Sequence, residues 1–162
     1  MDILVIQTGG TIDKDYPPQG LSYDFVINQP AAERIFTKVN PSFGHRTIEL
    51  LKKDSSDLTH EDRLLIRQTC EKSEEKYIII THGTDTITDT AQAIDIIEDK
   101  IIVLTGSMRP QRFGNTDADF NLGTAIGALS ALQPGVYIAM SGRVLPWRRL
   151  HKDYDHSQFI ES

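Results

Sequence analysis

Cysteine is almost absent from this chain of 162 residues, in which Cys70 stands alone. A single cysteine cannot form a disulfide within the chain, which favours a reducing compartment, and we expect a cytoplasmic location. Cys70 lies in a charged, helix-like stretch with no motif around it. The sequence therefore predicts an ordinary helix residue at this position, without a chemical role.

The sequence also lacks long hydrophobic runs, a basic leader and an excess of positive charge. Its longest apolar runs are far too short to span a bilayer, and the opening residues "MDILVIQ" contain no signal-peptide pattern. The formal net charge of -6 argues against a nucleic-acid or anionic-membrane partner. It is compatible with a small substrate that carries both charges.

What the chain does have is the composition of one globular domain, which we expect to span residues 1–162. Apolar runs predict five strands, at residues 2–7, 46–53, 76–83, 100–107 and 135–142. Helical spacing predicts helices at residues 31–39, 60–76, 84–99 and 117–132. This alternation predicts an α/β fold: a three-layer, doubly wound, mostly parallel sheet with helices on both faces.

Local signals refine this prediction. Thr59 is a good N-cap for the helix at residues 60–76, whose apolar face would hold Leu64, Leu65 and Cys70. In the following helix, the apolar residues extend at helical spacing from Ile87 to Ile97. Two further segments are predicted to be irregular: the exposed loop at residues 13–29 and the polar stretch from residue 143 onward.

Polar motifs follow four of the predicted strands. They are "TGGT" at residues 8–11, "DSSD" at 54–57, "THGTDT" at 81–86 and "TGSMRP" at 105–110. Each motif alone is compatible with a simple turn or a helix cap. Because the carboxyl ends of parallel strands share one edge, the four motifs predict a single rim rich in hydroxyls and backbone donors. The glycine loop matches neither phosphate-binding fingerprint.

These residues resemble the bacterial-type L-asparaginase family. Thr8-Gly9-Gly10-Thr11-Ile12 and His82-Gly83-Thr84-Asp85-Thr86 are similar to its two signatures. "DSSD", "TGSMRP" with "DADFNL", and "VLPWRRLHK" resemble further blocks of the family in the same order, from Leu4 to about Phe159. The resemblance implies the N-terminal catalytic domain of that family, and we expect the family's smaller C-terminal domain to be absent.

The resemblance implies a threonine nucleophile, Thr11, which attacks a side-chain amide and forms an acyl-enzyme as ammonia leaves. Tyr23, on a loop, is the expected activator, with Tyr16 as the alternative. Thr84, Asp85 and Lys152 would form a second catalytic cluster that moves protons and activates Thr84 or a water. Substrate-binding residues would be Gly10, Ser55, Ser56, Gly83, Asp85 and Ser107, with the serines of "DSSD" on the α-carboxylate and Asp85 on the α-ammonium.

Several alternatives stay open from the sequence. The chain could supply ammonia within an amidotransferase, or bind an amino acid without turnover, and the choice between asparagine and glutamine is undecided. We expect no cofactor and no metal, because the tail residues His151, Asp153, Asp155 and His156 match no metal-binding spacing. We expect His82 to form structural hydrogen bonds and Arg109 to hold its loop. A homodimer or larger homo-oligomer is the expected assembly.

Overall fold

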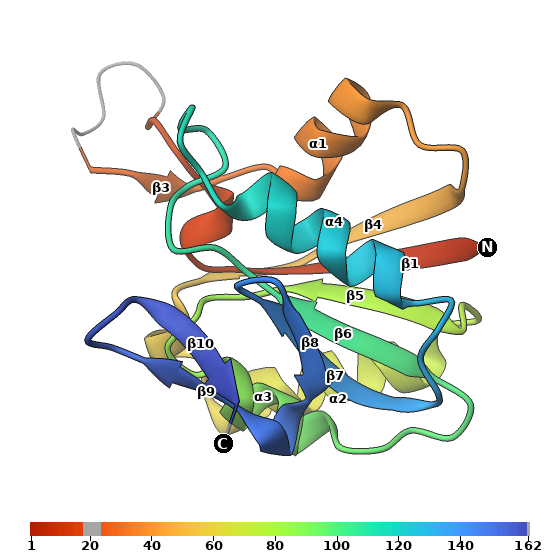
Figure 1. The fold of residues 1–162 in the computed structure, drawn as a ribbon. Helices are drawn as coiled ribbons and strands as arrows, with labels where there is room; N and C mark the ends of the chain where they lie inside the picture. The colour runs from red at the N-terminus through yellow and green to blue at the C-terminus, as the bar shows by residue number, and fades with distance from the viewer. Residues whose placement is uncertain (18–23, 162) are drawn as a thin grey trace.

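The computed structural model describes residues 1–17 and 24–161. Its centre is a six-stranded sheet in the order β4-β1-β5-β6-β7-β8 (Figure 1). Five strands run parallel: β1 (Asp2–Gly9), β4 (Gly44–Lys53), β5 (Tyr77–Thr81), β6 (Ile101–Thr105) and β7 (Gly135–Met140). The edge strand β8 (Arg143–Pro146) pairs antiparallel with β7. The mostly parallel sheet predicted from the apolar runs is therefore confirmed, with one more strand.

Helices cover both faces of the sheet, as the alternation predicts. Figure 1 shows α1 (Ala31–Val39) and α4 (Ala118–Ala128) on one face, and α2 (His60–Lys72) and α3 (Ile87–Ile94) on the other. Strand β1 illustrates this arrangement, since its successive residues pack alternately into two apolar clusters on opposite faces of the sheet. Leu4 and Ile6 belong to the apolar cluster under α2 and α3, whereas Ile3 and Val5 pack with α1 and α4. A strand buried on both faces must be apolar throughout.

The helices differ from the prediction in their boundaries, since α2, α3 and α4 all end before the predicted residue, and in one apolar face. Thr59 does cap α2, and it forms a reciprocal capping box with Asp62. The expected apolar face of α2 is confirmed for Cys70 but wrong for Leu64 and Leu65, which are exposed, because Ile66 and Cys70, four residues apart, face the sheet. Helix α3 ends at Ile94 rather than near residue 99, because the next residue adopts a φ of 50°, in the left-handed region.

Both segments predicted to be irregular contain strands. Within residues 13–29, β2 (Lys14–Asp15) pairs antiparallel with β3 (Val26–Ile27). After β8, a 3-10 turn η3 (Trp147–Arg149) leads to a hairpin of β9 (Leu150–Asp153) and β10 (Gln158–Glu161). This hairpin is ordered because Leu150 and Phe159 are buried in the core cluster that α2 and α3 also use. None of the described helices is both long and apolar enough to cross a membrane.

Candidate active site

The ends of β1 and β5 are joined directly, which brings two of the sequence motifs together. The Thr8 hydroxyl donates a hydrogen bond of 2.8 Å to the carbonyl oxygen of Thr81. Gly10 has a φ of 82°. It lies so close to the turn after β5 that a Cβ added to Gly10 would approach Gly83 Cα to 2.3 Å. Gly10 is therefore needed both for its backbone conformation and for its close approach to Gly83.

Thr11 follows this contact as the first residue of the 3-10 turn η1 (Thr11–Asp13), and it is half-buried. The close contact of the two glycines sets the Thr11 turn beside the turn that carries Thr84. Of the two candidate activators, Tyr23 lies outside the described residues. Tyr16 is 62% exposed as a residue, and its ring packs edge to face on that of Phe25, with ring centroids 5.3 Å apart.

Thr84, Asp85 and Lys152, which the sequence analysis grouped as a second cluster, lie in direct contact. Lys152 Nζ donates to Thr84 Oγ1 at 2.8 Å and is 2.5 Å from Asp85 Oδ1. The lysine comes from β9, where it pairs with Phe159 across the hairpin. Its side chain is 15% exposed, whereas that of Asp85 is 57% exposed. The ammonium is thus mostly shielded, while the carboxylate still faces solvent.

A pocket of about 200 Å³ opens beside this cluster. Its lining residues are Thr84, Asp85, Ile87, Thr88, His151, Lys152, Tyr154 and Phe159. Tyr154 is 66% exposed as a residue, and its ring centroid lies 4.8 Å from Lys152 Nζ, a cation–π arrangement. Sequence reasoning missed Tyr154, because only the hairpin turn brings it to the lysine.

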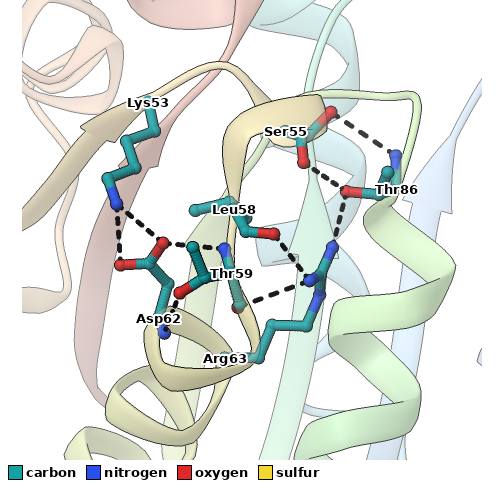
Figure 2. A network of polar contacts seen from close by, with 7 residues as sticks. All are labelled: Lys53, Ser55, Leu58, Thr59, Asp62, Arg63 and Thr86. Atoms are coloured by element: carbon teal, nitrogen blue, oxygen red, sulfur yellow. Dashed lines mark hydrogen bonds and ion pairs between the residues drawn. The ribbon is translucent and has the colours of Figure 1, made fainter.

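The "DSSD" motif forms the 3-10 turn η2 (Ser55–Asp57), which docks on the start of α3 (Figure 2). Thr86 Oγ1 donates to the carbonyl oxygen of Ser55 at 2.7 Å, and Thr86 N is 3.4 Å from Ser55 Oγ. Ser55 is buried and Ser56 is exposed. An added Cβ at Gly83 would lie 2.7 Å from Ser55 Oγ, so η2 also touches the His82-Gly83 turn.

Arg63, on α2, connects the η2 turn to the start of α3 through its hydrogen bonds. It was not predicted as a site residue. Figure 2 shows its guanidinium between η2 and α3, donating to Thr86 Oγ1 at 3.1 Å and to the carbonyl oxygen of Leu58 at 2.8 Å. Asp62, the residue before it, accepts from Thr59 N and pairs with Lys53 at 2.8 Å. In the sequence, Asp62 and Arg63 are only charged residues near the start of a helix. Because most helices begin in this way, nothing marked the two as site residues.

His82 is wholly buried, and its hydrogen bonds match the structural role expected from the sequence. Nδ1 donates to the carbonyl oxygen of Gly83 at 2.7 Å, and Nε2 accepts from the Thr90 hydroxyl at 2.8 Å. Burial lowers the pKa of His82 to about 4, and the nearby Arg63 adds to the lowering. The imidazole is therefore neutral near pH 7 and serves as a fixed connector between β5 and α3.

The loop after β6 is held by its own polar groups. The Ser107 hydroxyl donates to the carbonyl oxygen of Arg109 at 2.5 Å, and the Arg109 guanidinium donates to the carbonyl oxygen of Asn115 at 3.0 Å. Asp117 accepts the backbone N–H groups of Met108 and Arg109. Arg109 thus holds its loop, as expected. Ser107 faces the same loop, with 1% of its surface exposed.

The four tail residues considered as metal ligands do not form one cluster. His156 pairs with Asp153 at 2.8 Å, and this contact lowers the pKa of the Asp153 carboxyl. Across residues 1–17 and 24–161, no group of three or more His, Cys, Asp or Glu side chains is arranged to hold a metal ion. Trp147 is partly buried and packs against the main core cluster.

Three comparisons with known proteins, by family model, by sequence and by structure, each match this chain to asparaginases. The family model described as "Asparaginase, N-terminal" matches residues 2–157. The L-asparaginase of Thermococcus kodakarensis is 32% identical over 94% of this chain and 48% of its own length. The glutaminase-asparaginase of Pseudomonas fluorescens is 28% identical over 93% of this chain and 45% of its own length.

Solved structures agree with these sequence matches. The thermostable L-asparaginase from Thermococcus kodakarensis has a TM-score of 0.84 and 29% identity, covering 99% of this chain and 51% of that one. A probable cytoplasmic L-asparaginase from Campylobacter jejuni has a TM-score of 0.81 and 25% identity with the same coverage. The chain spans about half the length of the relatives that it matches.

Proposed function

Since this chain belongs to the asparaginase family, we propose that it is an amidohydrolase that releases ammonia from the side-chain amide of L-asparagine. Glutamine or a related small amide is the alternative substrate, since relatives include proteins named glutaminase-asparaginase. The observation that carries the proposal is the contact of Lys152 with both Thr84 and Asp85 beside a small pocket. A shielded ammonium bonded to a hydroxyl and a carboxylate is suited to proton transfer.

In the proposed reaction, the Thr11 oxygen bonds to the amide carbon and its proton passes to a base. The carbonyl oxygen becomes an oxyanion, which backbone N–H groups of the glycine turns stabilise. The amide nitrogen takes up a proton and leaves as ammonia, so that an ester to Thr11 remains. A water then attacks this ester, and the released hydroxyl recovers its proton. Tyr23, or alternatively Tyr16, would activate Thr11, while Thr84, Asp85 and Lys152 move protons.

Substrate binding is proposed along the same rim. Ser55 and Ser56 would hold the α-carboxylate, and the solvent-facing carboxylate of Asp85 would pair with the α-ammonium. Gly10 and Gly83 would offer backbone donors at close approach. Ser107 would contribute only if its hydroxyl turned from the Arg109 carbonyl to the substrate.

We also propose a cytoplasmic location and a homodimeric or larger assembly. The single cysteine is buried, and burial raises the pKa of its thiol to about 12, so the thiol stays protonated and unreactive at neutral pH, which suits a reducing compartment. The exposed ring of Tyr154 at the pocket supports assembly, because a second copy could cover it. The proposed chemistry uses only side chains and backbone groups of this chain, and it includes no metal or cofactor.

Ammonia release from asparagine, glutamine and a peptide amide tests the function on residues 1–162. We expect release from asparagine at a rate that Thr11→Val abolishes. Amino-acid binding by calorimetry without ammonia release would instead indicate a domain that binds without turnover. Release that needs an added partner protein would indicate an ammonia-supplying subunit.

A further inference from the structure

Asp13 is a wholly buried carboxyl group that closes the turn beginning at Thr11. Its Oδ1 accepts the backbone N–H of Ala31 at 2.7 Å, and its Oδ2 accepts the Thr81 hydroxyl at 3.3 Å. Ala31 is the first residue of α1, and the Pro30 N-cap before it supplies no side-chain hydrogen bond. Asp13 therefore caps α1 from another part of the chain, where a negative charge also favours the helix dipole.

The same side chain connects the two threonine turns. Asp13 lies two residues after Thr11, and its own N–H donates to the carbonyl oxygen of Gly10 at 3.2 Å. Thr81 is the last residue of β5, three residues before Thr84. One carboxyl group thus links η1, the end of β5 and the start of α1. Sequence reasoning did not select Asp13, because it falls within a segment that was expected to be an exposed loop.

We propose that Asp13 is a positioning residue, whose carboxylate holds the Thr11 turn in register with the strand end that carries Thr84. The inference rests on the proposed catalytic roles of Thr11 and Thr84. Because the reacting groups come from two different turns, a shift of one turn against the other would lower the rate of the chemical step.

The surroundings of Asp13 show which protonation state fits this role. The Ala31 N–H and the Thr81 hydroxyl both donate to the carboxyl group, so an ionised carboxylate satisfies both of them. Protonation turns one acceptor oxygen into a donor and disturbs this set.

Charged groups near Asp13 are few. Arg34 on α1 is the nearby charge that stabilises the carboxylate, and its guanidinium also donates to Gln111 Oε1 and to the carbonyl oxygen of Gln29. Arg34 also interacts electrostatically with Asp15 and Arg112, and these two residues form an ion pair with each other at 3.1 Å. Burial outweighs these favourable contacts and raises the pKa of Asp13 to about 6.

Two variants and a control separate positioning from simple stability. Asp13→Asn keeps an acceptor for the Ala31 N–H but cannot ionise, whereas Asp13→Ala removes both contacts. Glu98→Gln, which neutralises an exposed acid in the connection after α3, is the control. For each protein, kcat and KM are measured from about pH 5 to pH 8, together with the folded fraction by circular dichroism.

For Asp13→Ala we expect kcat per folded molecule to fall about 100-fold with KM changed less than about threefold. For Asp13→Asn, whose side-chain amide is neutral and places a donor where an acceptor oxygen stood, we expect kcat at least about tenfold below wild type near pH 8. Wild-type kcat should fall about tenfold between pH 7 and pH 5 through an inflection that Asp13→Asn lacks. Unchanged kcat per folded molecule in Asp13→Ala, or the same inflection in Asp13→Asn, would overturn the proposal.

A spectroscopic titration keeps this inference testable if no amide is hydrolysed, which would defeat the proposed function alone. The carboxyl carbon of Asp13 and the backbone amides of Thr11 and Thr84 are followed by NMR against pH. We expect the two amides to shift with the Asp13 midpoint near pH 6 in wild type and not in Asp13→Asn. Amides that ignore the titration of Asp13 would show that it does not couple the two turns.

Discussion

Lys152 Nζ lies 2.8 Å from Thr84 Oγ1, although 68 residues separate the two along the chain. The contact joins the end of a central parallel strand to a hairpin that follows the edge of the sheet. It depends on Leu150 and Phe159, whose buried side chains fix the hairpin against the core. The hairpin thus brings a shielded cation to a rim built otherwise from threonines, serines and glycines.

Lys152→Met should lower kcat by at least about 100-fold, because proton transfer by a positioned group acts mainly in the transition state. The methionine keeps most of the side-chain volume while removing the charge. Steady-state kinetics on asparagine give kcat and KM separately. Lys72→Met, at an exposed position on α2, is the matched control and should retain wild-type kinetics. A variant in which KM alone increased would make Lys152 a binding residue.

Thr11→Val should abolish ammonia release without unfolding the protein, since valine fills nearly the same volume at a half-buried position. The residual rate should be below about 1% of wild type, because no other group on η1 can replace the nucleophile. Ammonia release and thermal unfolding are measured on the same sample. Thr69→Val, at a half-buried site on α2, controls for loss of a hydroxyl. Wild-type activity in folded Thr11→Val would remove Thr11 from the mechanism.

Four of the parallel strands, β1, β5, β6 and β7, could be predicted because they are buried on both faces and therefore read as apolar runs, whereas the edge strand β4 is only partly buried. The hairpin at residues 150–161 could not, because "LHKDYDHSQFIE" is short and polar, with only Leu150 and Phe159 buried at its two ends. The roles of Asp13 and Arg63 were missed for a different reason. Both are defined by contacts with distant elements, and neither residue type nor spacing reports those contacts.

Gly83→Ala should destabilise the fold by about 1–3 kcal/mol and raise KM, because the added methyl overpacks a tight contact. Its Cβ would lie 2.7 Å from Ser55 Oγ and 2.8 Å from Ser55 Cβ, so the η2 turn must move. Urea unfolding and steady-state kinetics measure the two effects.

Gly123→Ala is the control for the glycine substitution. Gly123 lies within α4, and nothing is found within 4 Å of the added Cβ. Because alanine favours helix by about 1 kcal/mol over glycine, this variant should be neutral or more stable. A Gly83→Ala protein as stable as Gly123→Ala would show that the η2 turn can move without lowering the free energy of unfolding.

Two buried groups should give opposing pH dependences of stability. The pKa of Asp13 is raised from 3.8 to about 6, so folding takes up a proton between these values and stability falls as pH rises through them. The pKa of His82 is lowered from 6.5 to about 4, so folding releases a proton and stability falls as pH drops through that window. Over the shared range the two effects nearly cancel in wild type.

Asp13→Asn should expose this cancellation. Each pKa shift of about two units corresponds to about 3 kcal/mol, so the variant's free energy of unfolding, relative to wild type, should rise by about 3 kcal/mol from pH 3.5 to pH 7. The reason is that only wild type must ionise a buried carboxyl group over that range, while His82 acts equally on both proteins. Urea unfolding at half-unit pH steps measures the difference, with Glu98→Gln as the charge control. A difference that stays constant with pH would mean that Asp13 titrates in the folded protein as it does in the unfolded chain.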